Sequence, residues 1–408
     1  MRLSARRSYQ QLRFLTSMFH WMCFAVNSLY YIQIVHMTPL QLVLTGTMLE
    51  VSILLLEIPT GVVADVFSRR LSILIGLFLT GIGFFLQGLW PNFWVILLAQ
   101  VIWGAGFTFT SGATEAWITD ETDEEVAASL FMRGEQVGLI GAVLGIALGM
   151  GLGLISYAFT IKASGVVFLL LTLYFGLTMV ETGFHPIPQT ERTHMDSMIH
   201  TLKNGVRLTR SHPGLLGIFA IGLFFGLYSE GVDRLWEARM VDGFNFPLFE
   251  PVIWFGLIHI AGMLLGSLSL GLLQKWKYAT DLNQSIWLQS FLSVGIMAGL
   301  LIFAATGNFY VAAGMIFLIT IFREVHYPLY TGWVNRKLDS SVRATVLSMA
   351  SLVDASGQIG GGPLVGTIAT RMGIPFGLTI SALLLTPVLP FYAFLYRKLN
   401  GTTKSEQA

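Results

Sequence analysis

Apolar residues along this chain gather into long runs that are separated by short polar junctions. A helix needs about 20 such residues to cross the hydrocarbon core of a bilayer. About twelve runs reach that length, near residues 13–35, 39–66, 71–90, 93–119, 127–157, 164–183, 213–234, 250–274, 281–305, 309–334, 343–370 and 373–396. Lipid cannot pair open backbone groups, and these runs are too long for barrel strands. The pattern therefore predicts an all-α membrane protein with twelve transmembrane helices.

Composition agrees with a chain whose solvent is lipid. Hydrophobic residues make up 54% of the 408 residues and charged residues only 12%, against about 25% charged in a soluble domain. A net charge of +1 provides no general attraction to nucleic acid. The single cysteine, Cys23, excludes intrachain disulfides and cysteine-rich metal sites. No Gly-Lys phosphate loop, nucleophile–base pair or metal-ligand spacing appears, so we expect no enzyme, no ATP-driven pump, no metal and no cofactor.

The placement of Lys and Arg predicts the orientation of the helices. One side would carry the N-terminal arginines with Arg69, Arg70, Lys203, Arg207, Arg210, Lys275, Lys277, Arg336, Lys337, Arg343, Arg397 and Lys398. The opposite junctions carry only Lys162, Arg234, Arg239 and Arg371. Because short cytoplasmic junctions hold the excess of basic residues, both termini are predicted to be cytoplasmic. The protein would be a multi-pass protein of the cell (plasma) membrane.

A long polar connection divides the predicted helices into two pseudo-symmetric six-helix bundles. The predicted domains are an N-terminal bundle (1–183), a cytoplasmic linker (184–212) and a C-terminal bundle (213–408). The halves share a weak repeat, because Trp117-Ile-Thr-x3-Asp123 recurs as Trp333-Val-Asn-x3-Asp339, and the following glycine pair recurs as well. The motif and the glycine pair are separated from their second copies by the same number of residues, since Trp117 and Trp333 give 333 − 117 = 216 and Gly145 and Gly361 give 361 − 145 = 216. Duplicated halves are typical of secondary transporters.

The junction between the second and third predicted helices carries a motif. Gly61-x3-Asp65-x2-Ser68-Arg69-Arg70 resembles the loop signature of the major facilitator superfamily, in which glycine usually occupies the position of Ser68. The helix number, the division into halves, the middle connection and the cytoplasmic termini extend this resemblance over nearly the whole chain. Drug-exporter-like proton antiporters are the most similar members.

Two further signatures of such members are absent. The fifth helix carries three glycines at four-residue spacing without the Gly-Pro pair of many antiporters. Gln100 stands on the fourth helix where many proton-coupled members have arginine.

The resemblance implies a cytoplasmic gate that latches the two halves together in the outward-open state. Its members would be Glu57, Gly61, Asp65, Arg69 and Arg70. The alternative is that the two arginines only anchor the junction at the membrane surface. Glycine rows would allow close packing of helices in lipid, on the fifth helix through Gly141, Gly145 and Gly149, and on the eleventh through Gly357 and Gly361.

Polar residues within the spans are candidates for a substrate site, because their burial in lipid is costly. In the superfamily, helices 1, 4, 7 and 10 line the central cavity, and here these helices carry His20, Asn27, Tyr30, Tyr31, Glu115, Tyr228, Glu230, Asp233, Arg234, Arg323, His326, Tyr327 and Tyr330. The last four share one face at i, i+3, i+4 and i+7 spacing. The alternatives are a structural ion pair on helix 10 and a solvated end of helix 7.

Isolated carboxylates within the spans are candidates for proton coupling. A carboxyl group in an apolar environment tends to hold a proton at neutral pH. Glu324 and Asp354 are the main candidates, followed by Glu115 and Glu50, and structural hydrogen bonding is the alternative for each.

The sequence therefore predicts a secondary active transporter that works by alternating access. We expect proton-coupled export of a small, largely apolar compound by a functional monomer whose partners are a small-molecule substrate, protons and the lipid bilayer. One alternative is a proton-coupled importer of a polar or anionic metabolite held by Arg323. An alternative of another class is a non-transporting receptor or scaffold on the same fold.

Overall fold

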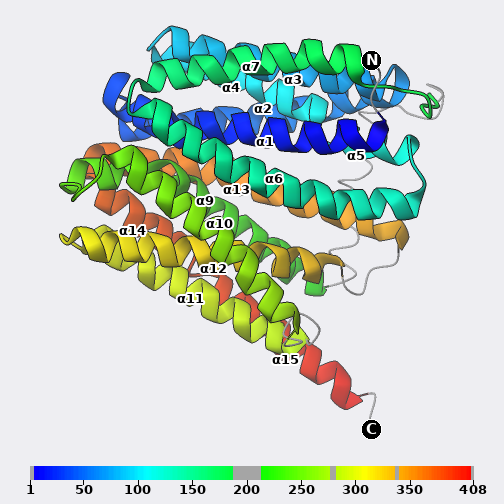
Figure 1. Cartoon of the computed structure of the whole chain (residues 1–408). Coiled ribbons are helices and arrows are strands. Elements are labelled where there is room, and N and C mark those ends of the chain that lie inside the picture. The colour runs from blue at the N-terminus through cyan, green and yellow to red at the C-terminus, as the bar shows by residue number, and fades with distance from the viewer. Residues whose placement is uncertain (1–3, 187–212, 276–281, 336–339, 406–408) are drawn as a thin grey trace. The chain divides into compact units, whose positions relative to one another are not determined.

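The computed structural model describes residues 4–186, 213–275, 282–335 and 340–405. Within these ranges all regular structure is helical (Figure 1). The first helices are α1 (Ala5–Leu29), its π-helical continuation η1 (Tyr30–Ile34), α2 (Pro39–Val66), α3 (Arg69–Leu89), α4 (Phe93–Thr110), α5 (Ala113–Asp120), α6 (Glu124–Gly153) and α7 (Tyr157–Thr178). The later ones are α9 (Pro213–Gly243), α10 (Pro251–Lys275), α11 (Leu282–Ala305), α12 (Phe309–Asn335), α13 (Ser340–Met372), α14 (Ile374–Leu384) and α15 (Val388–Ser405).

These helices form twelve membrane-length segments in the described residues, because α4 continues into α5 and α14 into α15. Ten of the described segments are long and apolar enough to cross a membrane. The two remaining segments, α1 and α13, have the length but are more polar. The predicted all-α membrane protein with twelve helices is thereby confirmed. The polarity of α1 and α13 suits helices that are covered by protein rather than by lipid.

Capping explains where several helices begin. Thr38 and Gln41 form a capping box before Pro39, so α2 covers the predicted range of 39–66. The Ser156 hydroxyl accepts a hydrogen bond from the Phe159 backbone, so α7 begins at Tyr157 instead of near residue 164. The predicted run of 93–119 is interrupted at Gly112, whose φ of 72° favours glycine.

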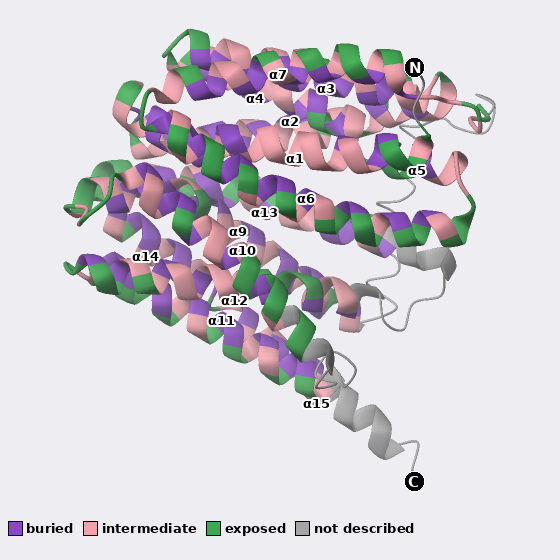
Figure 2. Cartoon of the chain, viewed as in Figure 1, coloured by how far each residue is buried: buried purple, intermediate pink, exposed green. Residues whose placement is uncertain are grey.

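Exposed apolar side chains mark the faces that lipid would cover. On α7, Leu170, Leu173 and Leu177 form a stripe at helical spacing and are all exposed. Figure 2 shows exposed and buried positions alternating along individual helices in this way. Such a surface would be poorly solvated by water, which supports the assignment of the chain as an integral membrane protein.

The chain divides into two compact units. Unit 1 comprises Met1–Gln41, Met48–Met195 and Leu248–Gly256, and unit 2 comprises Leu42–Thr47, Asp196–Pro247 and Leu257–Ala408. Most of the predicted linker lies outside the described residues, as do Lys203, Arg207, Arg210, Lys277, Arg336, Lys337 and Asp339. The predicted domain boundaries and orientation therefore remain predictions.

Unit 1 is built around the crossing of α1 with α6, and α3 packs against α4 and α7. The crossing is close because glycines on α6 face the α1 backbone. A methyl group at Gly141 would overlap the carbonyl oxygen of Phe14, and one at Gly145 would overlap that of Met18. In lipid, such small residues allow two helices to approach to backbone contact.

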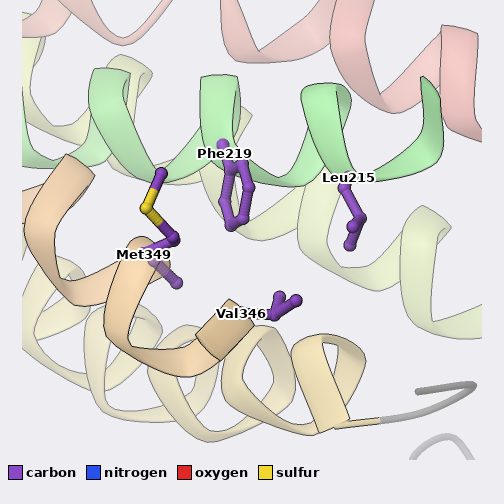
Figure 3. Packing of buried hydrophobic residues seen from close by; sticks show 5 residues of the cluster. Leu215, Phe219, Val346 and Met349 are labelled. Carbon is purple, nitrogen blue, oxygen red and sulfur yellow. The ribbon is translucent and has the colours of Figure 1, made fainter. Parts of the chain in front are cut away.

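Unit 2 contains a matching crossing between α9 and α13. Methyl groups at Gly357 and Gly361 would overlap the carbonyl oxygens of Leu223 and Leu227. The offsets are constant, since 357 − 141 and 361 − 145 equal 216, and 223 − 14 and 227 − 18 equal 209. A buried cluster of side chains closes one end of this crossing (Figure 3), formed by Leu215, Phe219, Val346, Met349 and Ala350.

One position of the crossing exchanges its glycine between the two units. In unit 1, Gly149 of α6 faces the backbone of Met22 on α1. The same offsets lead in unit 2 to Val365, which contacts Gly231 on α9 (365 − 149 = 216 and 231 − 22 = 209). The glycine is on α6 in unit 1 but on α9 in unit 2. Each contact still pairs one glycine with one larger residue, which conserves the volume at the contact. The repeat seen in the sequence thus corresponds to a repeated helix crossing.

We predict that alanine at Gly145 destabilises the protein, because its methyl group would force α1 and α6 apart. Overpacking of this kind costs about 1–3 kcal/mol, which thermal unfolding of the purified protein would detect as a lower midpoint. Gly151→Ala on the same helix is the control, since no atom lies within 4 Å of a methyl group there. Equal midpoints for the two variants would contradict the close crossing.

Candidate functional site

An ion pair lies near the middle of α12 in unit 2. The Arg323 guanidinium donates to both carboxylate oxygens of Asp233 on α9, with 2.8 Å between Nη2 and Oδ2. The guanidinium carbon lies 5.8 Å from the ring centre of Tyr228, a cation–π distance. The Arg323 and Asp233 side chains remain 31% and 40% exposed. Charges at this depth avoid lipid, so the exposed part faces the protein interior or water.

A second ion pair follows within one turn of α9. Arg234 Nε donates to Glu230 Oε1 at 2.9 Å, and Glu230 is buried. A methyl group at Gly362 of α13 would lie 3.0 Å from Glu230 Cγ, so the stem of Glu230 is held between α9 and α13. Both arginines predicted for the substrate site therefore have a carboxylate partner within unit 2.

Two carboxylates of unit 2 have no such cation. Asp354 on α13 accepts a hydrogen bond from Gln358 Nε2 at 2.9 Å, and the exposed Glu324 packs its stem against Gly266 of α10. Neither contacts a basic side chain in the described part of the chain, although both interact electrostatically with Arg323. We call the whole set the unit 2 charge cluster, which consists of Glu230, Asp233, Arg234, Arg323, Glu324 and Asp354. It has two more carboxylates than cations (4 − 2 = 2).

The other predicted residues of α12 do not take part in the ion pair. His326 is buried, with its ring stacked 3.8 Å from Phe225 and its Nε2 3.1 Å from the Tyr392 hydroxyl. Tyr327 is 70% exposed, and Tyr330 donates to a backbone carbonyl of α9 at 2.9 Å. The shared helical face predicted from their spacing therefore stacks the rings of His326 and Tyr330, with 6.1 Å between ring centres, whereas Arg323 bonds Asp233.

The buried polar network around Tyr392 was missed by sequence reasoning. On α11, Ser285, Gln289 and Ser293 follow each other at four-residue spacing and are buried. The Tyr392 hydroxyl lies 3.3 Å from Ser293 Oγ and donates to Gln289 Oε1 at 3.4 Å, while the Trp333 indole donates to Ser285 Oγ at 2.6 Å. The spacing within an apolar run was the available signal. Such bonds hold helices together in lipid.

The polar network of unit 1 is neutral. The Tyr31 hydroxyl donates to Gln87 Oε1 at 2.8 Å and accepts from Gln100 Nε2 at 2.9 Å. Tyr30 donates to the Gln87 carbonyl at 2.7 Å, and Gln87 Nε2 lies 3.6 Å from Cys23 Sγ. The π-helical turn places both consecutive tyrosines inside. Gln100 therefore carries hydrogen bonds, and no charge, at the position where the family resemblance led us to look for arginine.

The remaining candidates of unit 1 lie apart from this network. His20 is half-buried among aromatic rings, and Asn27 is buried with no partner for its Oδ1 among the described residues. Glu50 is half-buried on α2, and Glu115 is exposed in the first turn of α5. Glu50 and Glu115 remain candidates for proton coupling.

The junction between α2 and α3 is bound to the rest of unit 1. The Ser68 hydroxyl caps α3 by accepting from the Leu71 backbone at 2.9 Å, and it donates to Glu181 Oε2 at 2.6 Å. Arg69 forms an ion pair with Asp120 of α5 at 2.6 Å. The Arg70 backbone donates to Glu181 Oε1 at 2.8 Å, and its guanidinium donates to a carbonyl of α7.

Of the other predicted gate residues, Glu57, Gly61 and Asp65 lie in the second half of α2, and a methyl group at Gly61 would meet no described atom within 4 Å. A latch between the two halves remains a prediction.

The segment after α7 also bonds residues of α5 and of its C-terminal end. The Trp117 indole donates to the Val180 carbonyl at 2.8 Å. Glu121 at the end of α5 accepts from the Thr182 backbone and hydroxyl and from the Gly183 backbone, the last at 2.7 Å. Glu181 and Glu121 thus join α3, α5 and the chain after α7. Sequence reasoning missed both, although an acid near the N-terminus of a helix such as α3 is a favourable pairing.

Comparison with known proteins supplies a family. The model of the Major Facilitator Superfamily matches residues 12–362. The chain is 24% identical over 358 residues to the uncharacterized MFS-type transporter YxaM of Bacillus subtilis (strain 168), covering 86% of each protein.

Solved structures with the same fold include two transporters. The nucleoside transporter NupG has a TM-score of 0.76 at 12% identity, covering 97% of this chain and 99% of that one. A bacterial homologue of the human lysosomal transporter Spinster, inward-facing and unoccupied, has a TM-score of 0.75 at 14% identity, with 96% of each chain covered. At such identities the likeness concerns the fold alone.

We predict that Ser68→Ala destabilises unit 1 more than Ser156→Ala does. Both variants lose a helix cap worth about 1 kcal/mol, but only the first also loses the bond to the Glu181 carboxylate, worth about 1.5–3 kcal/mol. Thermal unfolding of the purified variants measures the difference. In a double-mutant cycle with Glu181→Gln, the two changes at Ser68 and Glu181 should be non-additive. Strict additivity would show that the bond contributes nothing.

We predict that Asp233→Asn destabilises unit 2, because it leaves the Arg323 guanidinium without its anion. A fully buried pair broken in this way costs about 3–5 kcal/mol, and partial exposure should reduce this to about 1–3 kcal/mol. Adding Arg323→Gln should restore part of the loss, since no charge is then left unpaired.

The control for this variant is Glu135→Gln, which breaks the ion pair between Arg13 of α1 and Glu135 of α6. Glu135 is 76% exposed, so this change should cost less than about 1 kcal/mol. No recovery in the double variant at Asp233 and Arg323 would refute the pairing as the source of stability.

Proposed function

The chain belongs to the Major Facilitator Superfamily, and on that premise we propose that it is a secondary active transporter working by alternating access. Two pseudo-symmetric six-helix bundles, residues 1–183 and 213–408, would rock around a central substrate site, with both termini in the cytoplasm. The family and the similar proteins are transporters, so the prediction that this protein is not an enzyme is confirmed. The plasma membrane is the location we propose.

The unit 2 charge cluster carries the proposal of proton coupling. Each of its arginines is already paired, so its two further carboxylates, Glu324 and Asp354, have no cation in the described residues. Two unpaired negative charges at bilayer depth are unfavourable, and proton binding removes them. The polar network of unit 1 consists of neutral groups that bond each other, which makes unit 2 the better supported location for coupling.

Proton binding would couple to conformation through the cost of excluding water. With Glu324 and Asp354 ionised, a conformation that keeps water at the cluster is favoured, because ionised groups lose hydration on closure. With both protonated, the cluster carries no net charge and closure costs less. Arg323 interacts electrostatically with both carboxylates, so its pair with Asp233 would respond to either change. A proton gradient then biases which side of the membrane the site faces.

We propose export of a small, largely apolar compound by a functional monomer. The resemblance to drug-exporter-like members supports the direction. The neutral polar network around Tyr31 in unit 1 supports the cargo class, since an apolar compound needs no counter-charge there. The cytoplasmic gate would include the bonds of Ser68, Arg69 and Arg70 to α5 and to the segment after α7.

A second candidate is a proton-coupled importer of a polar or anionic metabolite. The observation in its favour is the partial exposure of the Arg323 guanidinium, which an anionic group could approach. The bidentate bond to Asp233 weighs against it, because an anion would first have to displace that carboxylate. A receptor or scaffold on the same fold would have no use for unpaired carboxylates at this depth.

We predict that Asp354→Asn abolishes proton-driven transport. Protein reconstituted into liposomes with an imposed pH gradient would be given the neutral dye N-phenyl-1-naphthylamine, with a pH dye inside to follow protons. The amide binds no proton, so the gradient should no longer drive dye movement, and the driven rate should fall by about tenfold or more, the effect of about 1.4 kcal/mol or more.

Glu125→Gln is the matched control, because Glu125 is exposed at the start of α6, lies outside the unit 2 charge cluster and is none of the predicted site residues. Its driven rate should equal that of the unaltered protein. Dye movement without proton movement in the unaltered protein would contradict coupling. Dye and protons moving in the same direction would favour the importer.

A further inference from the structure

Aromatic rings surround His20 in unit 1. Its imidazole stacks on Phe24, with 4.4 Å between ring centres and 9° between ring planes. The rings of Trp103 on α4 and Phe84 on α3 lie 5.5 Å and 5.7 Å from it. Phe84 is buried, whereas His20, Phe24 and Trp103 are only half-buried. Three rings from α1 and α4 therefore keep part of their surface open at bilayer depth.

The ring of Trp103 does not lie on the face of α4 that carries the exposed Trp94 and Leu98. These two residues are 72% and 55% exposed. Trp103 follows Trp94 by nine residues, which is about two and a half helical turns, so the two tryptophans lie on opposite faces. His20 and Phe24 lie on α1, which is more polar than the helices that are apolar enough to cross a membrane. This polarity favours contact of α1 with protein rather than with lipid.

Two of these rings have hydrogen-bonding atoms without a partner. The His20 imidazole and the Trp103 indole N–H form no hydrogen bond with any described residue. The polar groups of the neighbouring network around Gln87 are, in contrast, bonded to each other. Polar groups inside a protein are normally paired. Here the Trp103 N–H and the His20 imidazole are free to bond a ligand that packs against the neighbouring rings.

The same site offers nothing to a charged ligand. The rings that contact the His20 imidazole, those of Phe24, Phe84 and Trp103, carry no charge. A cation or an anion placed there would lose its hydration without gaining a counter-charge. Aromatic faces favour a flat ligand, which can stack on them over a large area.

We propose that His20, Phe24 and Trp103 bind the ring of the cargo, and that the cargo class is an uncharged, planar heteroaromatic compound. Phe24 and Trp103 stack on its faces, and the Trp103 N–H and the His20 imidazole bond its ring heteroatoms. The network of Tyr31, Gln87 and Gln100 fixes α1, α3 and α4 around it. This inference rests on the proposed transport function and names its substrate class.

Binding of three isosteric probes tests this inference. The purified protein in lipid nanodiscs is titrated at pH 8 with neutral quinoline, with naphthalene and with cationic N-methylquinolinium, and empty nanodiscs serve as the blank. Quinoline should bind most tightly. Naphthalene lacks the ring nitrogen and N-methylquinolinium carries a charge, so each should bind about tenfold more weakly or worse, the effect of about 1.4 kcal/mol. Equal or tighter binding of either would overturn the proposal.

Conservative variants connect the binding to the named residues. Trp103→Phe keeps a ring but removes the N–H, so quinoline affinity should fall about fivefold to tenfold, the effect of one hydrogen bond of about 1 kcal/mol. Naphthalene affinity should stay unchanged. Quinoline has a single ring nitrogen and accepts one hydrogen bond, so His20→Phe is titrated with quinoxaline, whose second ring nitrogen can accept from the imidazole, and its affinity should fall by the same factor. Trp94→Phe, on the opposite face of α4, is the control and should alter none of these affinities. An equal loss in Trp94→Phe, or none in both site variants, would refute the site.

Binding is measured here without transport, so the two proposals fail separately. If quinoline and quinoxaline binding follow the site variants but no protons move with any cargo, the proposed coupling is wrong and the ring site stands. If proton-driven dye transport persists while Trp103→Phe leaves quinoline binding unchanged and His20→Phe leaves quinoxaline binding unchanged, the ring site is wrong and the transport function stands.

Discussion

Hydrocarbon offers no hydrogen bonds, so every polar group at bilayer depth must find its partner inside the protein. This constraint makes the described chain helical and explains the buried networks in each unit. Tyr31 bridges Gln87 and Gln100 in unit 1, and Tyr392 connects α11 with α12 in unit 2. The glycines at the two repeated crossings serve the same end, because they let helix backbones meet where no water drives association.

Groups that escape this constraint are the ones to which we assign function. Glu324 and Asp354 have no cation, and His20 and Trp103 have no hydrogen-bond partner, within the described residues. Unpaired carboxylates need protons, whereas unpaired neutral rings need a neutral ligand. The rings belong to unit 1 and the carboxylates to unit 2. In our proposal, cargo recognition in unit 1 and proton binding in unit 2 are therefore chemically separate, and alternating access is what connects them.

Partners of individual side chains were the least predictable feature. Helical spacing grouped His326 with Arg323, yet His326 bonds Tyr392 of α15, a residue far along the chain. Ser68 was recognised only as a departure from the family motif, and its bond to Glu181 explains what the hydroxyl does there. In both cases the deciding neighbour lies on another helix. Periodicity specifies which face a residue occupies, but it carries no information about what that face meets.

The sequence by itself determined the solvent of this protein, its helices and the repeat of its halves. Run length and hydropathy determine these locally, and the helix number and the α2 bounds were accordingly predicted. Only the tertiary structure decided which charges are neutralised. It paired Arg323 with Asp233 and Arg69 with Asp120, and within the described ranges it left Asp354 and Glu324 without a cation. The physical reason is that an ion pair forms over a few ångströms in space, between residues far apart in the chain.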